Sequence, residues 1–131
     1  MNNQKSEYIK SWLLKANEDI AVVIELSSEK PEMYATAISF HAQQAVEKFL
    51  KAYLVFRDIE FGRTHDVDFL LSECMSVETS GFEDIDLKNL NDFAVTIRYP
   101  DDFLTPALRE ITEFKEIALQ VKKIVEEKIE S

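Results

Sequence analysis

The stretch FHAQQAVEKFLKAYL, residues 40–54, decides the fold of this chain of 131 residues. Within it and on either side, apolar side chains recur every three or four positions, the spacing at which side chains share one face of an α-helix. The stripe consists of Ile38, Ala42, Ala45, Phe49, Ala52 and Phe56. The apolar arc is widened to well over half the circumference by Val46, Leu50, Tyr53 and Leu54. A helix that apolar must contact several neighbours, so we predict a central helix from about residue 32 to residue 56.

The remaining arc of this helix is polar and carries Gln44, Glu47, Lys48 and Lys51, with Phe40 among them. Glu47 and Lys51 stand four positions apart in the favourable order, a pair that stabilises a solvated helix by about 0.2–0.5 kcal/mol. Solvation of the face is one interpretation, and a surface that binds a partner or a ligand is the other. The candidate residues for such a surface are Phe40, Gln44, Lys48 and Lys51.

The same helical spacing occurs in four further segments. We expect a helix over residues 7–28, a short helix from about Asp66 to Cys74, a fourth from about Asp86 to Ile97, and a last one from Pro106 onward. No repeat, linker or low-complexity run divides the chain. The prediction is a single domain over residues 1–131, an all-α, up-and-down antiparallel bundle of four long helices plus the short extra one.

Composition excludes several classes of protein. The chain has only 2 Gly and 3 Pro, too few for the many tight turns of an all-β sandwich or barrel. It has no uninterrupted apolar run of about 18 residues, so no membrane span is expected. The lone Cys74 cannot form an internal disulfide, which favours a reducing, cytoplasmic location. Neither histidine has a second histidine at ligand spacing, so we expect no metal ion, and we expect no cofactor.

The charge is acidic and uneven. The net charge is −10, and residues 66–131 hold 16 acidic against 7 basic side chains, whereas residues 1–65 hold 9 against 8. An acidic surface repels phosphate backbones. We therefore expect no binding to duplex DNA.

Four short segments together carry a family resemblance: WLLKANEDIA at 12–21, FHAQQAVEKFLKAYL at 40–54, RTHDVDFLL at 63–71 and IRYPDDF at 97–103. In this order and spacing they resemble the small prokaryotic HEPN domains, over about residues 8–129. The resemblance implies a helical bundle that forms homodimers through paired helices. It also implies, for many members, pairing with a minimal nucleotidyltransferase protein as toxin and antitoxin, and for others a metal-independent ribonuclease activity.

The ribonuclease members resemble one another in an arginine, four to six variable residues, and then a histidine. The matching arginine is Arg98, but the histidine positions hold Phe103, Leu104 and Thr105. Because the imidazole that would move a proton near neutral pH is absent there, we favour a non-catalytic, homodimeric interaction module that binds a nucleotide or a nucleotidyltransferase partner. The alternative is a ribonuclease in which Arg98 holds the phosphate of RNA and His65 serves as a displaced base.

The remaining candidates each have two interpretations. His65 follows Thr64 at a helix start, where its ring can hold the turn by bonding a loop carbonyl, and His41 fits a packed, hydrogen-bonded core histidine. Arg98 and Tyr99 precede two aspartates, which favours either a local ion pair or a contact with a nucleotide or a partner. We expect the dimer interface to include the exposed face of the central helix or the region of Arg98.

Overall fold

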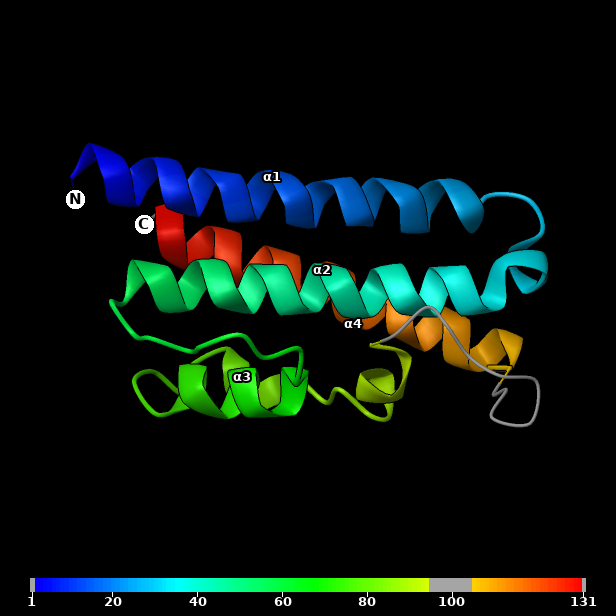
Figure 1. The fold of residues 1–131 in the computed structure, drawn as a ribbon. Helices are drawn as coiled ribbons and strands as arrows, with labels where there is room; N and C mark the ends of the chain where they lie inside the picture. The colour runs from blue at the N-terminus through cyan, green and yellow to red at the C-terminus, as the bar shows by residue number, and fades with distance from the viewer. Residues whose placement is uncertain (1, 95–104, 131) are drawn as a thin grey trace.

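The computed structural model describes residues 2–94 and 105–130, and this part of the chain contains helices and no β-strand. The body of this part consists of four α-helices: α1 (Asn3–Leu26), α2 (Ala35–Phe56), α3 (Val67–Met75) and α4 (Leu108–Glu130). Short 3-10 helices lie between them at Pro31–Tyr34, Phe82–Asp84 and Leu90–Phe93. Figure 1 shows the long α1, α2 and α4 lying along one another, with the shorter α3 beside α2. The predicted all-α bundle is confirmed.

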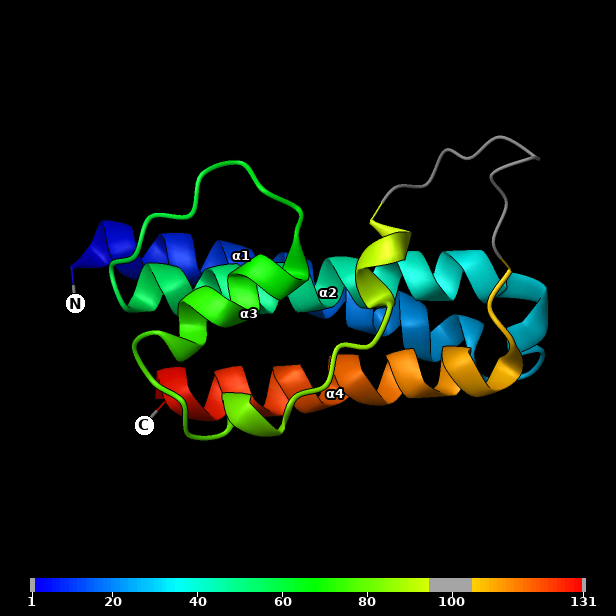
Figure 2. The ribbon, with the colours of Figure 1, turned by 90° about the horizontal axis from the view of Figure 1, so that it is seen from below.

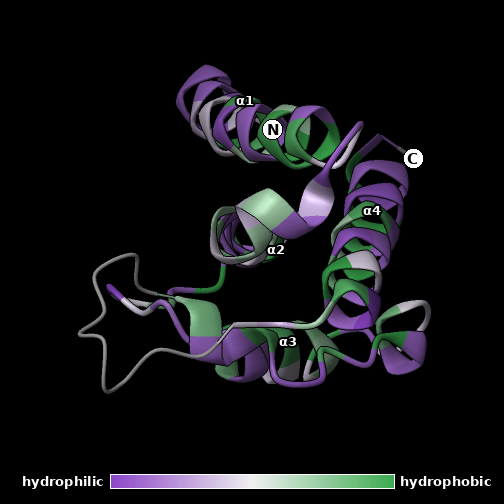
Figure 3. Ribbon diagram, turned by 90° about the vertical axis from the view of Figure 1, so that its right-hand side faces the viewer, coloured by the Kyte–Doolittle hydropathy of each residue, from purple (hydrophilic) through white to green (hydrophobic). Residues whose placement is uncertain are grey.

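The central position of α2 is also confirmed. In the end-on view of Figure 3, α2 is flanked by α1, α4 and α3. Its fully buried side chains include Phe49, Leu50, Tyr53 and Leu54. They pack in one cluster with side chains of the neighbouring helices, among them Ala16, Ile20, Val23, Leu70, Phe114 and Val121. Since each large apolar side chain contributes about 1.5–3 kcal/mol when fully buried, this cluster supplies the main driving force for folding.

The helices follow two directions along the bundle. α1 and α2 run antiparallel, joined by a short connection in which Ser27 caps the end of α1 and Pro31 begins the next turn. α4 runs in the same direction as α2 (Figure 1). The reason is visible in Figure 2: residues 57–66 and 76–94 return along the bundle without forming a long helix.

The prediction of a helix from about Asp86 to Ile97 is wrong for the residues that the structure describes. Its residues Leu87, Leu90 and Phe93 are buried as expected, but only Leu90–Phe93 are helical, as one 3-10 turn. The side chain of Asp86 accepts a hydrogen bond from the backbone N–H of Lys88 at 3.0 Å, and Lys88 has a φ of 51°. A left-handed residue interrupts an α-helix, so these residues reach the core through turns. Ile97 lies outside the described residues.

A polar cluster ties the end of α2 to α4. The Tyr53 hydroxyl donates to Oε1 of Glu78 at 2.6 Å and accepts from Nη1 of Arg57 at 2.7 Å. Nζ of Lys128 lies 3.0 Å from the same Glu78 oxygen. Burial, with the bond to Glu78, raises the pKa of Tyr53 to about 12. The hydrogen bond from Tyr53, together with that from Lys128, lowers the pKa of the Glu78 carboxyl.

This cluster predicts a pH dependence of stability. Because the pKa of Glu78 is lowered in the folded state, its contribution is present above the ordinary glutamate pKa of about 4.3 and is lost as the pH falls through the folded-state value. The difference in unfolding free energy between wild type and Glu78→Gln should therefore shrink between pH 7 and pH 3. Urea unfolding at both pH values measures it. Glu83→Gln, an exposed glutamate of the same connecting segment, is the control, and a pH-independent difference for Glu78→Gln would contradict the assignment.

Candidate functional site

The candidate site is the face of α2 that points away from α4. α1 lies along one edge of this face (Figure 3) and covers its deeper part, while the outer part stays partly exposed. We call it the open face of α2, and it consists of the part-exposed Phe40, His41, Gln44 and Lys48 and the deeper Gln43, Glu47 and Lys51. α1 borders it on one side, and residues 57–66 border it on the other.

A buried carboxylate of α1 anchors the first half of this face. Asp19 is only 7% exposed, and its two carboxylate oxygens contact two residues of α2. Nδ1 of His41 lies 2.8 Å from Oδ1, and Nζ of Lys48 donates to Oδ2 at 2.6 Å. Because a buried carboxylate requires partners, Asp19 fixes both side chains and locks α1 to α2.

A buried ion pair organises the second half. Glu47 and Lys51 are 3% and 5% exposed, and Nζ of Lys51 donates to Oε2 of Glu47 at 3.0 Å. The other oxygen of Glu47 lies 3.0 Å from Nδ1 of His65. Gln43 donates from Nε2 to the backbone carbonyl of His65 at 2.8 Å. Side chain and backbone of His65 are thus both held by α2.

Aromatic rings complete the surroundings of the Lys51 ammonium. Nζ lies 5.3 Å from the centre of the Trp12 ring and 5.5 Å from that of Phe61. These two rings meet edge to face, with centroids 6.2 Å apart. A cation away from water is attracted to ring faces, worth about 2 kcal/mol when desolvated. The rings and the Glu47 carboxylate together compensate the loss of water around Lys51.

The two halves are connected. Nε2 of Gln44 donates to Oε1 of Gln43 at 2.7 Å. Phe40 packs edge to face on the His41 ring, with centroids 5.2 Å apart. Contacts therefore hold the outer residues Phe40, His41, Gln44 and Lys48, so the open face presents a preorganised surface.

His65 has the orientation of a proton acceptor. Its side chain is 69% exposed, while its Nδ1 faces the buried Glu47. A carboxylate only accepts hydrogen bonds, so Nδ1 donates and Nε2 is the basic nitrogen. No described residue forms a hydrogen bond with Nε2. Within residues 2–94 and 105–130, no three His, Cys, Asp or Glu side chains gather in a way that could hold a metal ion.

Several expectations for the candidate residues are corrected. Lys51 is not a surface residue, and the solvated interpretation of the Glu47–Lys51 pair is wrong, because Trp12 and Phe61 cover the Lys51 ammonium and both side chains are buried. The ring of His65 bonds the Glu47 carboxylate instead of a loop carbonyl. His41 is hydrogen-bonded as expected, but it is partly exposed and not a core residue.

Phe40, Gln44 and Lys48 are part-exposed members of the open face. Arg98 and Tyr99 lie outside the described residues, as do Phe103 and Leu104; Thr105 is exposed.

Sequence reasoning missed Asp19 and Trp12. Asp19 carried a signal, since it stands three positions after Ala16 and four before Val23, on the apolar side of α1. A carboxylate on a core-facing stripe requires a buried partner. Trp12 gave no comparable signal, because an aromatic side chain on such a stripe is ordinary core material.

The comparisons with known proteins identify one family. A family model described as HEPN domain matches residues 9–130, which includes α2, α3, α4 and most of α1. Comparisons with curated proteins and with solved structures gave no significant match. No helix among the described residues combines the length and apolar character that a membrane span requires.

The buried ion pair predicts an unequal response to single and double substitution. Glu47→Leu leaves the Lys51 ammonium buried without its carboxylate and should lower the unfolding free energy by about 3–5 kcal/mol. Replacing both members, Glu47→Leu with Lys51→Met, should restore most of that loss, because two apolar side chains leave no charge unpaired. Urea unfolding followed by circular dichroism measures both. Lys10→Met, in an exposed pair with Glu7 at 3.7 Å, is the control; an equal loss from it and from Glu47→Leu would refute the interpretation.

Proposed function

The chain belongs to the HEPN domain family, and from this premise we propose that it is a non-catalytic interaction module of that family, a homodimer that pairs through the open face of α2. The partner beyond its own second copy is a minimal nucleotidyltransferase protein, in a toxin–antitoxin-like pair, or a nucleotide. The observation that carries the proposal is a preorganised helix face whose outer residues, Phe40 among them, stay partly exposed among the described residues.

The composition of the open face suits a protein–protein contact. Aromatic residues are enriched in interfaces, and polar side chains that are already hydrogen-bonded lose little freedom when a partner covers them. Phe40 supplies the aromatic side chain, and Gln44 and Lys48 supply polar groups held by Gln43 and Asp19. A second copy would bring the same residues to the interface, as two-fold symmetry requires.

Charge favours a protein over a nucleotide as the further partner. The ammonium of Lys48 is bound by Asp19 and that of Lys51 is buried against Glu47. Both lysines of the open face therefore already have a carboxylate, and neither is free to bind a phosphate. With a net charge of −10, the chain also repels phosphates at a distance.

Sequence supports the absence of catalysis. Three positions follow Arg98 at the spacing of the family's ribonuclease histidine, and they hold Phe103, Leu104 and Thr105. None of these side chains can exchange a proton near neutral pH. The second candidate function is a metal-independent ribonuclease in which His65 is the base. It is favoured by the 3.0 Å contact of His65 Nδ1 with the buried Glu47, which orients Nε2 outward.

The dimer is tested by the mass of the protein in solution. Wild type should show twice the chain mass of 15.2 kDa at micromolar concentration by light scattering, and Phe40→Glu should shift it to a monomer by placing a charge in an apolar contact. Phe69→Glu, which changes an exposed phenylalanine of α3, is the matched control and should stay dimeric. A monomeric wild type would contradict the proposed homodimer. A Phe40→Glu variant that remains dimeric would show that the interface does not include the open face of α2.

Catalysis is tested on RNA. A single-stranded RNA incubated with the purified protein and a chelator should remain intact, because the histidine of the family motif is absent. The readout is the length of the RNA after incubation. Cleavage that disappears in His65→Ala or Arg98→Ala would reject the non-catalytic proposal and support the displaced-base ribonuclease.

A further inference from the structure

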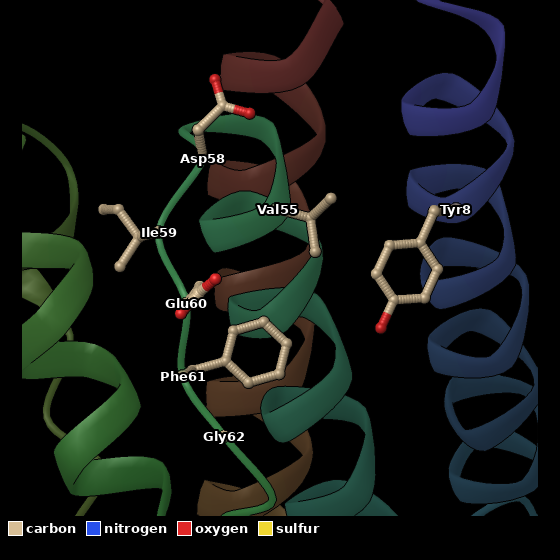
Figure 4. Close-up of a pocket in the computed structure, with 7 residues that line it drawn as sticks. All are labelled: Tyr8, Val55, Asp58, Ile59, Glu60, Phe61 and Gly62. Atoms are coloured by element: carbon tan, nitrogen blue, oxygen red, sulfur yellow. The ribbon is translucent and has the colours of Figure 1, made fainter.

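A second site lies between the start of α1 and the end of α2. A cavity of about 430 Å³ opens there, and Figure 4 shows its lining. The cavity is lined by two aromatic residues, Tyr8 and Phe61. Two aliphatic residues, Val55 and Ile59, and two acidic residues, Asp58 and Glu60, also line it. The open face of α2 does not include any of these residues.

The aromatic walls are held in place by Trp12. Its ring meets Tyr8 edge to face at 5.9 Å and Phe61 edge to face at 6.2 Å. Tyr8 is nevertheless 52% exposed, so much of its ring is available to a ligand. One side of Phe61 already attracts the Lys51 ammonium, 5.5 Å from the ring centre. A second cation is therefore better placed at Tyr8, with Phe61 left to pack on an apolar stem.

The backbone fixes the carboxylates at this cavity. After α2, Asp58 has a φ of 59°, and the N–H of Ile59 donates to the carbonyl of Leu54 at 2.9 Å. This is a Schellman-type helix end, whose left-handed position ordinarily holds glycine. Gly62, with a φ of 68°, makes a second left-handed turn. Glu60 and Phe61 lie between the two turns, and the ring of Phe61 points toward Val55 and Tyr8 (Figure 4).

One carboxylate of the site already binds an ammonium group. Nζ of Lys5 lies 3.0 Å from both oxygens of Asp58. Glu60 is exposed, and no cation of the described residues pairs with it. The site thus has one neutralised and one available carboxylate, beside an exposed ring.

We propose that this cavity binds an arginine side chain of a basic peptide segment on a partner protein. A planar guanidinium stacks on an aromatic ring and bonds a carboxylate through two N–H groups, so Tyr8 and Glu60 together match it. The methylene stem of arginine packs on Val55 and Phe61. The net charge of −10 attracts a basic segment from a distance. This inference does not depend on the dimer through the open face of α2.

The experiment compares two peptides of nearly the same shape, one with the cationic guanidinium of arginine and one with the neutral urea of citrulline. The acetylated and amidated tripeptide Gly-Arg-Gly should shift the amide signals of residues 8 and 58–62 in NMR titrations, whereas the same peptide with citrulline should bind about tenfold more weakly, because citrulline lacks the cation. Equal binding of the two peptides would overturn the proposal. Binding of free arginine as tight as that of the peptide would overturn the assignment to a peptide segment.

Matched variants separate the site from general attraction by the acidic surface. Glu60→Gln and Tyr8→Leu should each weaken binding of the arginine peptide about tenfold, by loss of the carboxylate or of the ring. Glu127→Gln makes the same charge change on the exposed face of α4 and should bind like wild type. Phe40→Glu should also bind the arginine peptide like wild type, so that a failure of the proposed dimer can be told apart from a failure of the proposed arginine site. An equal effect of Glu127→Gln and Glu60→Gln would leave only nonspecific attraction and reject the site.

Discussion

The buried pair of Glu47 and Lys51 is the constraint on which the surface of this molecule depends. Both charges lie within the fold, at 3% and 5% exposure, and removing two ions from water costs several kcal/mol each. The surrounding structure compensates that cost with the 3.0 Å contact between them, the rings of Trp12 and Phe61, and the His65 ring on the second Glu47 oxygen. The pair is therefore accommodated only where Trp12 of α1 and Phe61 lie against α2.

That constraint also produces the features with functional meaning. Phe61 lies over Lys51 and is also part of the lining of the acidic aromatic cavity, together with Tyr8. Because Glu47 accepts from His65, the imidazole is held with its basic nitrogen outward. The buried pair thus contacts residues of both regions, His65 beside the open face of α2 and Phe61 at the cavity.

The sequence predicted the fold well and the site only in part. The apolar stripe from Ile38 to Phe56 specified the central helix and the all-α bundle; the helix, expected from about residue 32, begins at Ala35 after a 3-10 turn at Pro31–Tyr34. The prediction of a helix from Asp86 failed. Leu87, Leu90 and Phe93 have helical spacing, but the left-handed Lys88 interrupts the helix. At the site, Phe40, Gln44 and Lys48 were correctly placed near the surface, whereas Lys51 was not.

The sequence by itself determined the central helix and which arc of α2 is apolar, because both follow from local propensity and from the 3.6-residue period. The same period made Glu47 and Lys51 neighbours. Only the tertiary structure decided whether that neighbouring pair meets water or protein. Lys51 is covered by Trp12 of α1 and by Phe61 of the segment after α2. The periodicity within one helix carries no information about which residues of another segment pack against it.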